Sequence, residues 1–213
     1  ANFRLAEVYM RSGQFDKATA IITEFGEMDP ANTKVEDFKG MKMRVMPLYI
    51  PALKALGATP VTIPPTEIYT AMERGVVDGF MWPNVGMISW GLQEVTKYQM
   101  KPGVFAMEPA TMINLDKWNK IPKDLQEMMM EVMKDTEYIA TMRSIMIEKK
   151  EEAIRKAAGM EIITLSPEEA QKFLTICYDK TWEFVTGMAP EYAPKLKKLS
   201  SPESLPKGSF PWQ

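Results

Sequence analysis

The sequence has 213 residues, of which 46% are hydrophobic, a composition typical of a globular protein with a buried core. Its 26 Lys and Arg against 28 Asp and Glu give a net charge of -2, so charge gives no reason to expect a nucleic acid or an anionic membrane as partner. The chain contains no His and a single Cys, which excludes triads of the Ser-His-Asp and Cys-His types.

The sequence shows no feature typical of redox chemistry, membrane insertion or export. Cys177 lies in the apolar run 173–178, so we interpret it as a buried small hydrophobe, and one Cys leaves the redox compartment undecided. No stretch of about 18 apolar residues is present, so no transmembrane helix is expected. The sequence begins at Ala1 without the charged and apolar regions of an export signal, so we expect that signal to be absent or already removed.

Residues 1–33 carry apolar side chains at helical spacing on both sides of a break at Ser12 and Gly13. This spacing predicts a hairpin of two short helices. The pattern from Leu5 to Pro30 resembles a single tetratricopeptide repeat, which is a helix-turn-helix of about 34 residues. One repeat cannot bury its own apolar face, so the hairpin packs on another element, either as a repeat-like unit or as part of the main domain.

The next region alternates short strands and helices. Strands are predicted over residues 41–45, 58–63 and 76–82, with helices over 48–56 and 65–75 that end at Gly57 and Gly75. This rhythm favours an α/β fold with partly parallel strand pairing. Short strands are also predicted over 103–107 and 111–114.

Residues 122–158 form the longest predicted helix. Apolar residues three or four positions apart indicate one buried face, and we interpret its many Met residues as core. The charged run from Glu148 to Glu152 is interpreted as a solvated helix face with i, i+4 pairs. At 1.5 Å per residue the helix would extend roughly 55 Å, so it either bends or bridges two lobes. A strand over 160–165 and a helix over 166–186 follow.

Two places carry residues suited to ligand binding. Arg44 lies near the carboxyl end of a predicted strand, where open α/β sheets hold ligands, and its planar guanidinium matches a carboxylate with two hydrogen bonds. Trp82 and Asn84 follow another strand and would offer an apolar wall together with a donor and an acceptor. The alternatives are that Arg44 is a surface residue, that Trp82 is core and that Asn84 is a turn residue.

Several motifs in this order and spacing resemble the solute-binding proteins of tripartite ATP-independent periplasmic (TRAP) transporters. They are Lys39–Val45 (KGMKMRV), Ala52–Val61 (ALKALGATPV), Thr66–Gly79 (TEIYTAMERGVVDG) and Ile121–Gln126 (IPKDLQ). The resemblance covers about residues 34–195. It implies a two-lobed, periplasmic-binding-protein-like α/β receptor that binds an organic acid in the periplasm and delivers it to membrane permease subunits.

The resemblance also implies roles for single residues. Arg44 would pair with the ligand carboxylate, and Met81, Trp82 and Asn84 would line the pocket. Similar keto-acid receptors carry a Glu at the position of Met81 that helps to hold a cation. A thioether is a poor ligand for hard cations, so no metal or other cofactor is expected here.

The N-terminal region departs from the family pattern. Members carry a longer region before the position of Lys34, so we expect an incomplete first lobe, a chain that is a fragment or a fusion, or a partner chain or oligomer that completes the lobe. We therefore expect a helical hairpin over 1–33 and a solute-binding α/β region over 34–213. The alternative function is a protein–protein interaction module that uses the hairpin and the long helix without a ligand. An enzyme is not expected, nor is a nucleic-acid partner.

Overall fold

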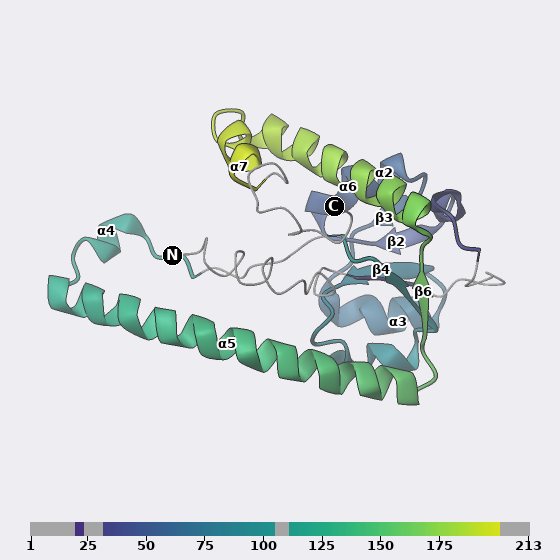
Figure 1. The fold of residues 1–213 in the computed structure, drawn as a ribbon, viewed down its shortest axis with the longest axis horizontal. Coiled ribbons are helices and arrows are strands. Elements are labelled where there is room, and N and C mark those ends of the chain that lie inside the picture. Colours follow the sequence, from purple (N-terminus) through teal and green to yellow (C-terminus); the bar gives the residue numbers. More distant parts are fainter. Residues whose placement is uncertain (1–19, 24–31, 105–110, 201–213) are drawn as a thin grey trace.

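A computed structural model of the protein describes residues 20–23, 32–104 and 111–200, and it contains one mixed six-stranded sheet covered by helices on both faces (Figure 1). The strands lie in the order β3 (Thr59–Val61), β2 (Lys42–Arg44), β4 (Gly79–Trp82), β1 (Ala20–Thr23), β5 (Tyr98–Lys101) and β6 (Glu161–Thr164). The α/β class predicted from the alternating elements is therefore confirmed.

The sheet consists of two parallel parts joined by one antiparallel strand. β2 pairs in parallel with both β3 and β4, and β5 pairs in parallel with β6. β1 lies antiparallel between β4 and β5. Because β3, β2 and β4 run in the same direction, their carboxyl ends meet at one edge, where Arg44 lies opposite Val61 and Phe80.

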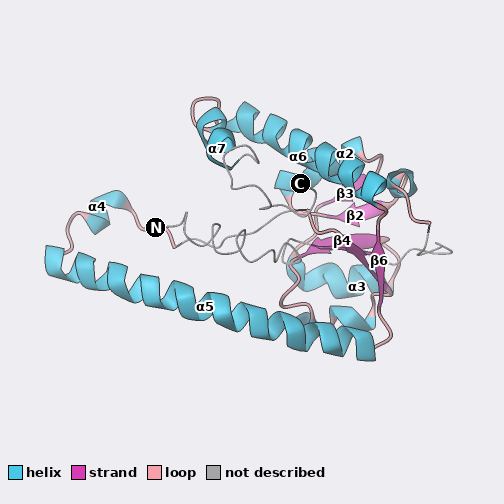
Figure 2. Cartoon of the chain, viewed as in Figure 1, coloured by secondary structure: helices cyan, strands magenta, loops and turns pink. Residues whose placement is uncertain are grey.

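Helices form a layer on each face of the sheet (Figure 2). One face carries α2 (Ile50–Ala55) and α6 (Pro167–Met188), which α7 (Ala193–Ser200) follows. The other face carries α3 (Ile68–Glu73) and the C-terminal part of α5 (Lys123–Ala157). The described residues also form short helices: η2 (Val35–Phe38), η3 (Pro47–Tyr49), η4 (Pro65–Glu67), η5 (Ile88–Trp90), η6 (Leu92–Glu94) and α4 (Leu115–Trp118).

Two apolar clusters fill the two layers. The side chains of β4 alternate between them, with Met81 in the cluster under α2 and α6 and with Phe80 and Trp82 in the cluster under α3. Cys177 is buried in the first cluster, as predicted, and this burial raises the pKa of its thiol. Strand alternation thus decides that Trp82 and Met81 face opposite layers.

Local signals account for several element boundaries. Gly57 and Gly75 adopt φ of 83° and 64° after α2 and α3, which glycine allows without steric cost. At the start of α6, Ser166 accepts a hydrogen bond from the backbone N–H of Glu169, and Pro167 occupies the first helical position. The long helix begins and ends within one residue of its predicted bounds.

The N-terminal prediction needs correction. Residues Ala20–Thr23 form strand β1 inside the sheet, so a helix over this part of the predicted hairpin is wrong. Pairing on both sides overrides the helical spacing of the apolar residues. Residues 1–19 and 24–31 lie outside the described part of the chain. Residues 111–114 are not a strand, and of the predicted strand 103–107 only 103 and 104 are described, outside any strand.

The burial predicted for α5 is also wrong over most of its length. The helix continues well beyond the sheet (Figure 1), and large apolar side chains along it are exposed, including Met128 (58%) and Met146 (70%). The charged run was expected to be solvated, yet Glu151 is buried. Helical periodicity identifies a face of the helix but not what covers that face. None of the described helices is long and apolar enough to cross a membrane.

Candidate functional site

Arg44 occupies the last position of β2, at the edge where the carboxyl ends of three parallel strands meet. Its Nε donates to the backbone carbonyl of Ile63 at 3.0 Å, just beyond β3. Its Nη1 donates to the carbonyl of Met81 in β4 at 3.4 Å. Backbone groups from the two neighbouring strands thus hold the guanidinium at the predicted strand edge.

Among the described residues, the buried guanidinium of Arg44 has no counter-charge. Its residue is only 5% exposed, and no carboxylate of the described residues forms an ion pair with it. Burial lowers the pKa of Arg44, because desolvation disfavours the charged form. A desolvated cation whose hydrogen bonds all go to neutral groups binds an incoming anion strongly, since little of its charge is compensated.

Trp82 provides the apolar side of this site. The guanidinium carbon of Arg44 lies 5.9 Å from the centre of its ring, within range of a cation–π interaction. Trp90 packs edge-on against the same indole, with ring centres 5.9 Å apart. The buried Nε1 of Trp82 has no hydrogen-bond partner among the described residues. Trp82 is therefore core by burial and also a neighbour of Arg44.

Met81 contributes to the Arg44 site through its backbone. Its side chain packs in the cluster under α2 and α6, whereas its carbonyl oxygen accepts from Arg44. The thioether thus lies on the sheet face opposite Trp82. Of the four residues predicted from the sequence, the structure brings together the Arg44 guanidinium, the Trp82 ring and the Met81 carbonyl.

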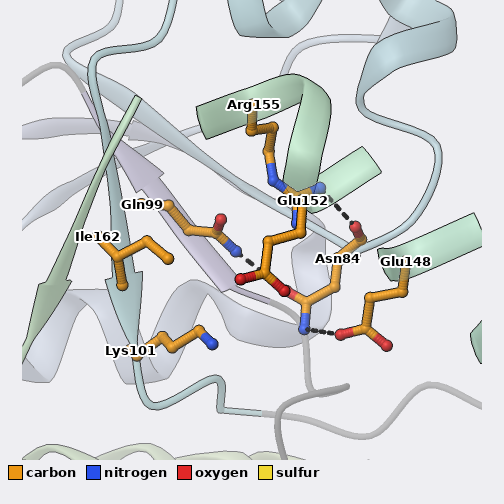
Figure 3. A pocket seen from close by; sticks show the side chains of 7 residues that line it. All are labelled: Asn84, Gln99, Lys101, Glu148, Glu152, Arg155 and Ile162. Carbon is orange, nitrogen blue, oxygen red and sulfur yellow. Dashed lines mark hydrogen bonds between the residues drawn. The ribbon is translucent and has the colours of Figure 1, made fainter. Parts of the chain in front are cut away.

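Asn84 belongs to a separate polar pocket beside the C-terminal part of α5 (Figure 3). Its Oδ1 accepts from Gln99 Nε2 at 3.4 Å, and its Nδ2 donates to Glu148 at 3.5 Å. Six polar side chains line this pocket: Asn84, Gln99, Lys101, Glu148, Glu152 and Arg155. Within the described residues no group of three or more Cys, Asp or Glu is arranged to hold a metal ion.

Glu151 and Arg155 of α5 hold the backbone of the loop after β4. The sequence did not identify either residue as part of a site. Gly86 N–H donates to both carboxylate oxygens of Glu151 at 3.0 Å, and Arg155 Nη1 donates to the carbonyl of Asn84 at 3.0 Å. Arg155 lies 3.7 Å from Glu151, and both are buried. The spacing of this pair matches that of the exposed pair Glu152 and Lys156, so spacing alone could not identify it.

Burial and charge oppose each other at Arg155. Burial lowers the pKa of its guanidinium, while the nearby carboxylates of Glu151, Glu152 and Glu148 raise it. Arg155 is 5% exposed, the same fraction as Arg44. The two buried arginines therefore differ in their charge environment rather than in their burial.

A family model and two relatives with similar sequences all represent bacterial solute-binding proteins. The family model DctP, described as bacterial extracellular solute-binding protein, family 7, matches residues 24–184. A solute-binding protein of Albidiferax ferrireducens is 32% identical over 70% of this chain and 45% of its own length. The C4-dicarboxylate-binding periplasmic protein DctP of Rhodobacter capsulatus is 29% identical over 71% of this chain and 47% of its own. The chain thus spans about half the length of these relatives.

Solved structures share the fold. A TRAP periplasmic solute-binding protein from Desulfovibrio salexigens with bound orotic acid superposes with a TM-score of 0.78 at 22% identity, covering 92% of this chain and 68% of that one. A TRAP protein from Rhodoferax ferrireducens with bound malonate gives 0.72 at 27% identity, covering 92% and 64%. The tetratricopeptide resemblance of residues 1–33 receives no support from these comparisons.

Proposed function

Because the chain belongs to family 7 of the bacterial extracellular solute-binding proteins, we propose that it is the ligand-recognising part of a periplasmic receptor for a small organic acid. The acid would pair with Arg44 and pass to the membrane permease subunits of a TRAP transporter. The proposed role is binding rather than catalysis. The observation that carries the proposal is the guanidinium of Arg44, buried at a strand edge and without a carboxylate partner in the described part of the chain.

Physical chemistry supports an anion as the ligand. The two carbonyls that accept from Arg44 orient the guanidinium but leave its positive charge uncompensated. A carboxylate would supply that charge with a planar pair of acceptors that matches the guanidinium. The ring of Trp82 beside the guanidinium suits the carbon skeleton of a small acid.

The ligands of the relatives support the same class. Their descriptions name C4-dicarboxylates for the Rhodobacter protein, malonate for the Rhodoferax protein and orotic acid for the Desulfovibrio protein. Each of these ligands carries a carboxylate. The proposed interaction module without a ligand has no comparable support among these relatives.

Titration calorimetry on the 213-residue chain tests the proposal. Malonate, succinate, pyruvate and orotate serve as ligands, and malonamide serves as a neutral control. Arg44→Ala is expected to weaken binding of the preferred acid by about 2–5 kcal/mol, a factor of roughly 30 to several thousand. Arg44→Lys should retain part of the affinity, because the charge remains but the planar pair of donors is lost.

Arg74→Ala provides the matched control, since Arg74 is exposed after α3. The Arg74→Ala variant should bind the acid with the same affinity as the unmodified chain. Undiminished binding by Arg44→Ala, or equal binding of malonate and malonamide, would contradict the proposal.

A further inference from the structure

The loop after β4 is attached to α5 through charged groups. Gly86 N–H is shared by both oxygens of the Glu151 carboxylate, and the Asn84 carbonyl accepts from Arg155. Glu151 and Arg155 are one helical turn apart and form a buried ion pair at 3.7 Å. Two side chains of one rigid helix thus hold a three-residue segment by its backbone.

Burial makes these contacts strong. Glu151 is 7% exposed and Arg155 is 5% exposed, so both bond to the loop away from water. Hydrogen bonds with one charged partner are shorter and stronger than neutral ones, and low local dielectric increases that difference. The position of the loop therefore depends on where α5 holds these two side chains.

The same loop follows Trp82 directly and turns back near its indole. Gly86 has φ of 93°, and a Cβ added to it would lie 4.0 Å from Trp82 Nε1. The Trp82 ring in turn lies 5.9 Å from the guanidinium carbon of Arg44. Only Pro83 separates Trp82 from Asn84 in the chain. The hydrogen bonds from Glu151 and Arg155 therefore fix the backbone immediately after Trp82, whose ring lies beside Arg44.

We propose that Glu151 and Arg155 are positioning residues of the Arg44 site, which hold the loop at Asn84–Gly86 so that Trp82 stays against the guanidinium. They act on the affinity for the acid without touching it. This inference rests on the proposed function of Arg44. It gives the C-terminal part of α5 an indirect influence on ligand binding through the loop, and Figure 3 shows Arg155 of this helix beside Asn84.

The test combines calorimetry with nuclear magnetic resonance of the indole N–H groups. The chain has five Trp residues, and the Trp82→Phe variant identifies the Trp82 signal by its loss. Glu151→Gln is expected to shift that signal and to lower the affinity for malonate by about tenfold, as for residues that act on a site through another residue. Arg155→Lys, which keeps the charge but not the planar donors, should give a smaller change in both readouts.

Phe173→Leu is the matched control for lost stability. Phe173 is fully buried in α6 on the opposite face of the sheet and stacks on Phe38, so its variant weakens the core without touching the loop. It should leave the Trp82 signal and the affinity unchanged. An equal loss of affinity in Phe173→Leu would overturn the inference, because the effect would then follow stability alone.

The outcomes separate this inference from the proposed function. If Arg44→Ala loses affinity while Glu151→Gln keeps both its affinity and its Trp82 signal, the positioning role fails and the proposed function stands. If Arg44→Ala binds malonate undiminished, the proposed function fails. Should Glu151→Gln not fold, Arg155→Lys decides by the same two readouts, with an unchanged Trp82 signal counting against the inference.

Discussion

Arg44 and Arg155 are equally buried, but among the described residues only Arg155 has a carboxylate partner. Arg44 bonds to two backbone carbonyls, whereas Arg155 pairs with Glu151 and donates to the loop after β4. Removing one member of a buried ion pair leaves the other charge uncompensated, so such a pair is needed by the fold. A lone buried cation destabilises the fold unless something else supplies the opposite charge. Burial alone therefore does not distinguish a structural arginine from a ligand-binding one, whereas the charge of its hydrogen-bond partners does.

The largest expected effect is on the paired arginine. Arg155→Met should lower the free energy of unfolding by about 3–5 kcal/mol, because Glu151 would remain buried without its cation. Urea denaturation followed by circular dichroism measures this loss. Lys156→Met is the control, since Lys156 pairs with Glu152 at the surface and should cost at most about 1 kcal/mol. Equal losses in the two variants would remove the distinction between a buried and an exposed pair.

A smaller effect, of opposite sign, is expected at Arg44. Without ligand, Arg44→Met should raise the free energy of unfolding by about 1 kcal/mol, because an apolar side chain of similar length replaces an uncompensated buried cation. The same denaturation experiment measures the gain, with malonate absent. A loss above about 2 kcal/mol would mean that the two carbonyl hydrogen bonds make Arg44 a structural residue.

The smallest effect sets the pH range in which the two arginines can be compared. Burial raises the pKa of the Cys177 thiol in the folded chain above about 8.5, its value in an unfolded chain. The unfolded chain therefore loses this proton first as pH rises. The stabilising contribution is complete near pH 7 and declines as pH rises through 8.5, so that about 0.8 kcal/mol is lost at pH 9.

Denaturation at pH 7 and pH 9 measures this decline. In Cys177→Ala, the difference in the free energy of unfolding between pH 7 and pH 9 should be smaller by about 0.8 kcal/mol. This expectation does not depend on how the substitution changes stability at pH 7. An unchanged pH dependence in Cys177→Ala would assign it to other groups. The arginine variants are therefore best compared near pH 7.

Local features of the fold were predictable from the sequence. Alternating apolar residues identify β2, and glycines with positive φ mark the ends of α2 and α3. The bounds of the long helix follow from its periodicity. Strand β1 was missed because its apolar residues also fit helical spacing, and pairing with two distant strands decides its conformation. Such pairing depends on residues about 60 to 80 positions away and leaves no local signal.

The candidate site was predictable only in part. Arg44 was expected at the edge of the sheet because it ends a strand and precedes Pro47, and the structure has it there. The partners of Arg44 and Arg155 depend on tertiary packing, so the sequence could not distinguish the two. The exposure of the apolar face of α5 also depends on tertiary packing, because helical periodicity does not show which elements pack against the helix.

The central position of β1 has a consequence for how the sheet can be taken apart. Among the strands that the structure describes, β1 alone connects the edge of β4 with the edge of β5. In a shortened chain that begins at Asn32, β4 and β5 would each lack the backbone hydrogen bonds that β1 provides. Their unpaired N–H and C=O groups would face each other across the position of β1. Backbone bonding of this kind accepts a strand supplied as a separate molecule. A synthetic peptide spanning Ala20–Thr23 should therefore restore the sheet of that shortened chain, with no covalent connection between the two pieces.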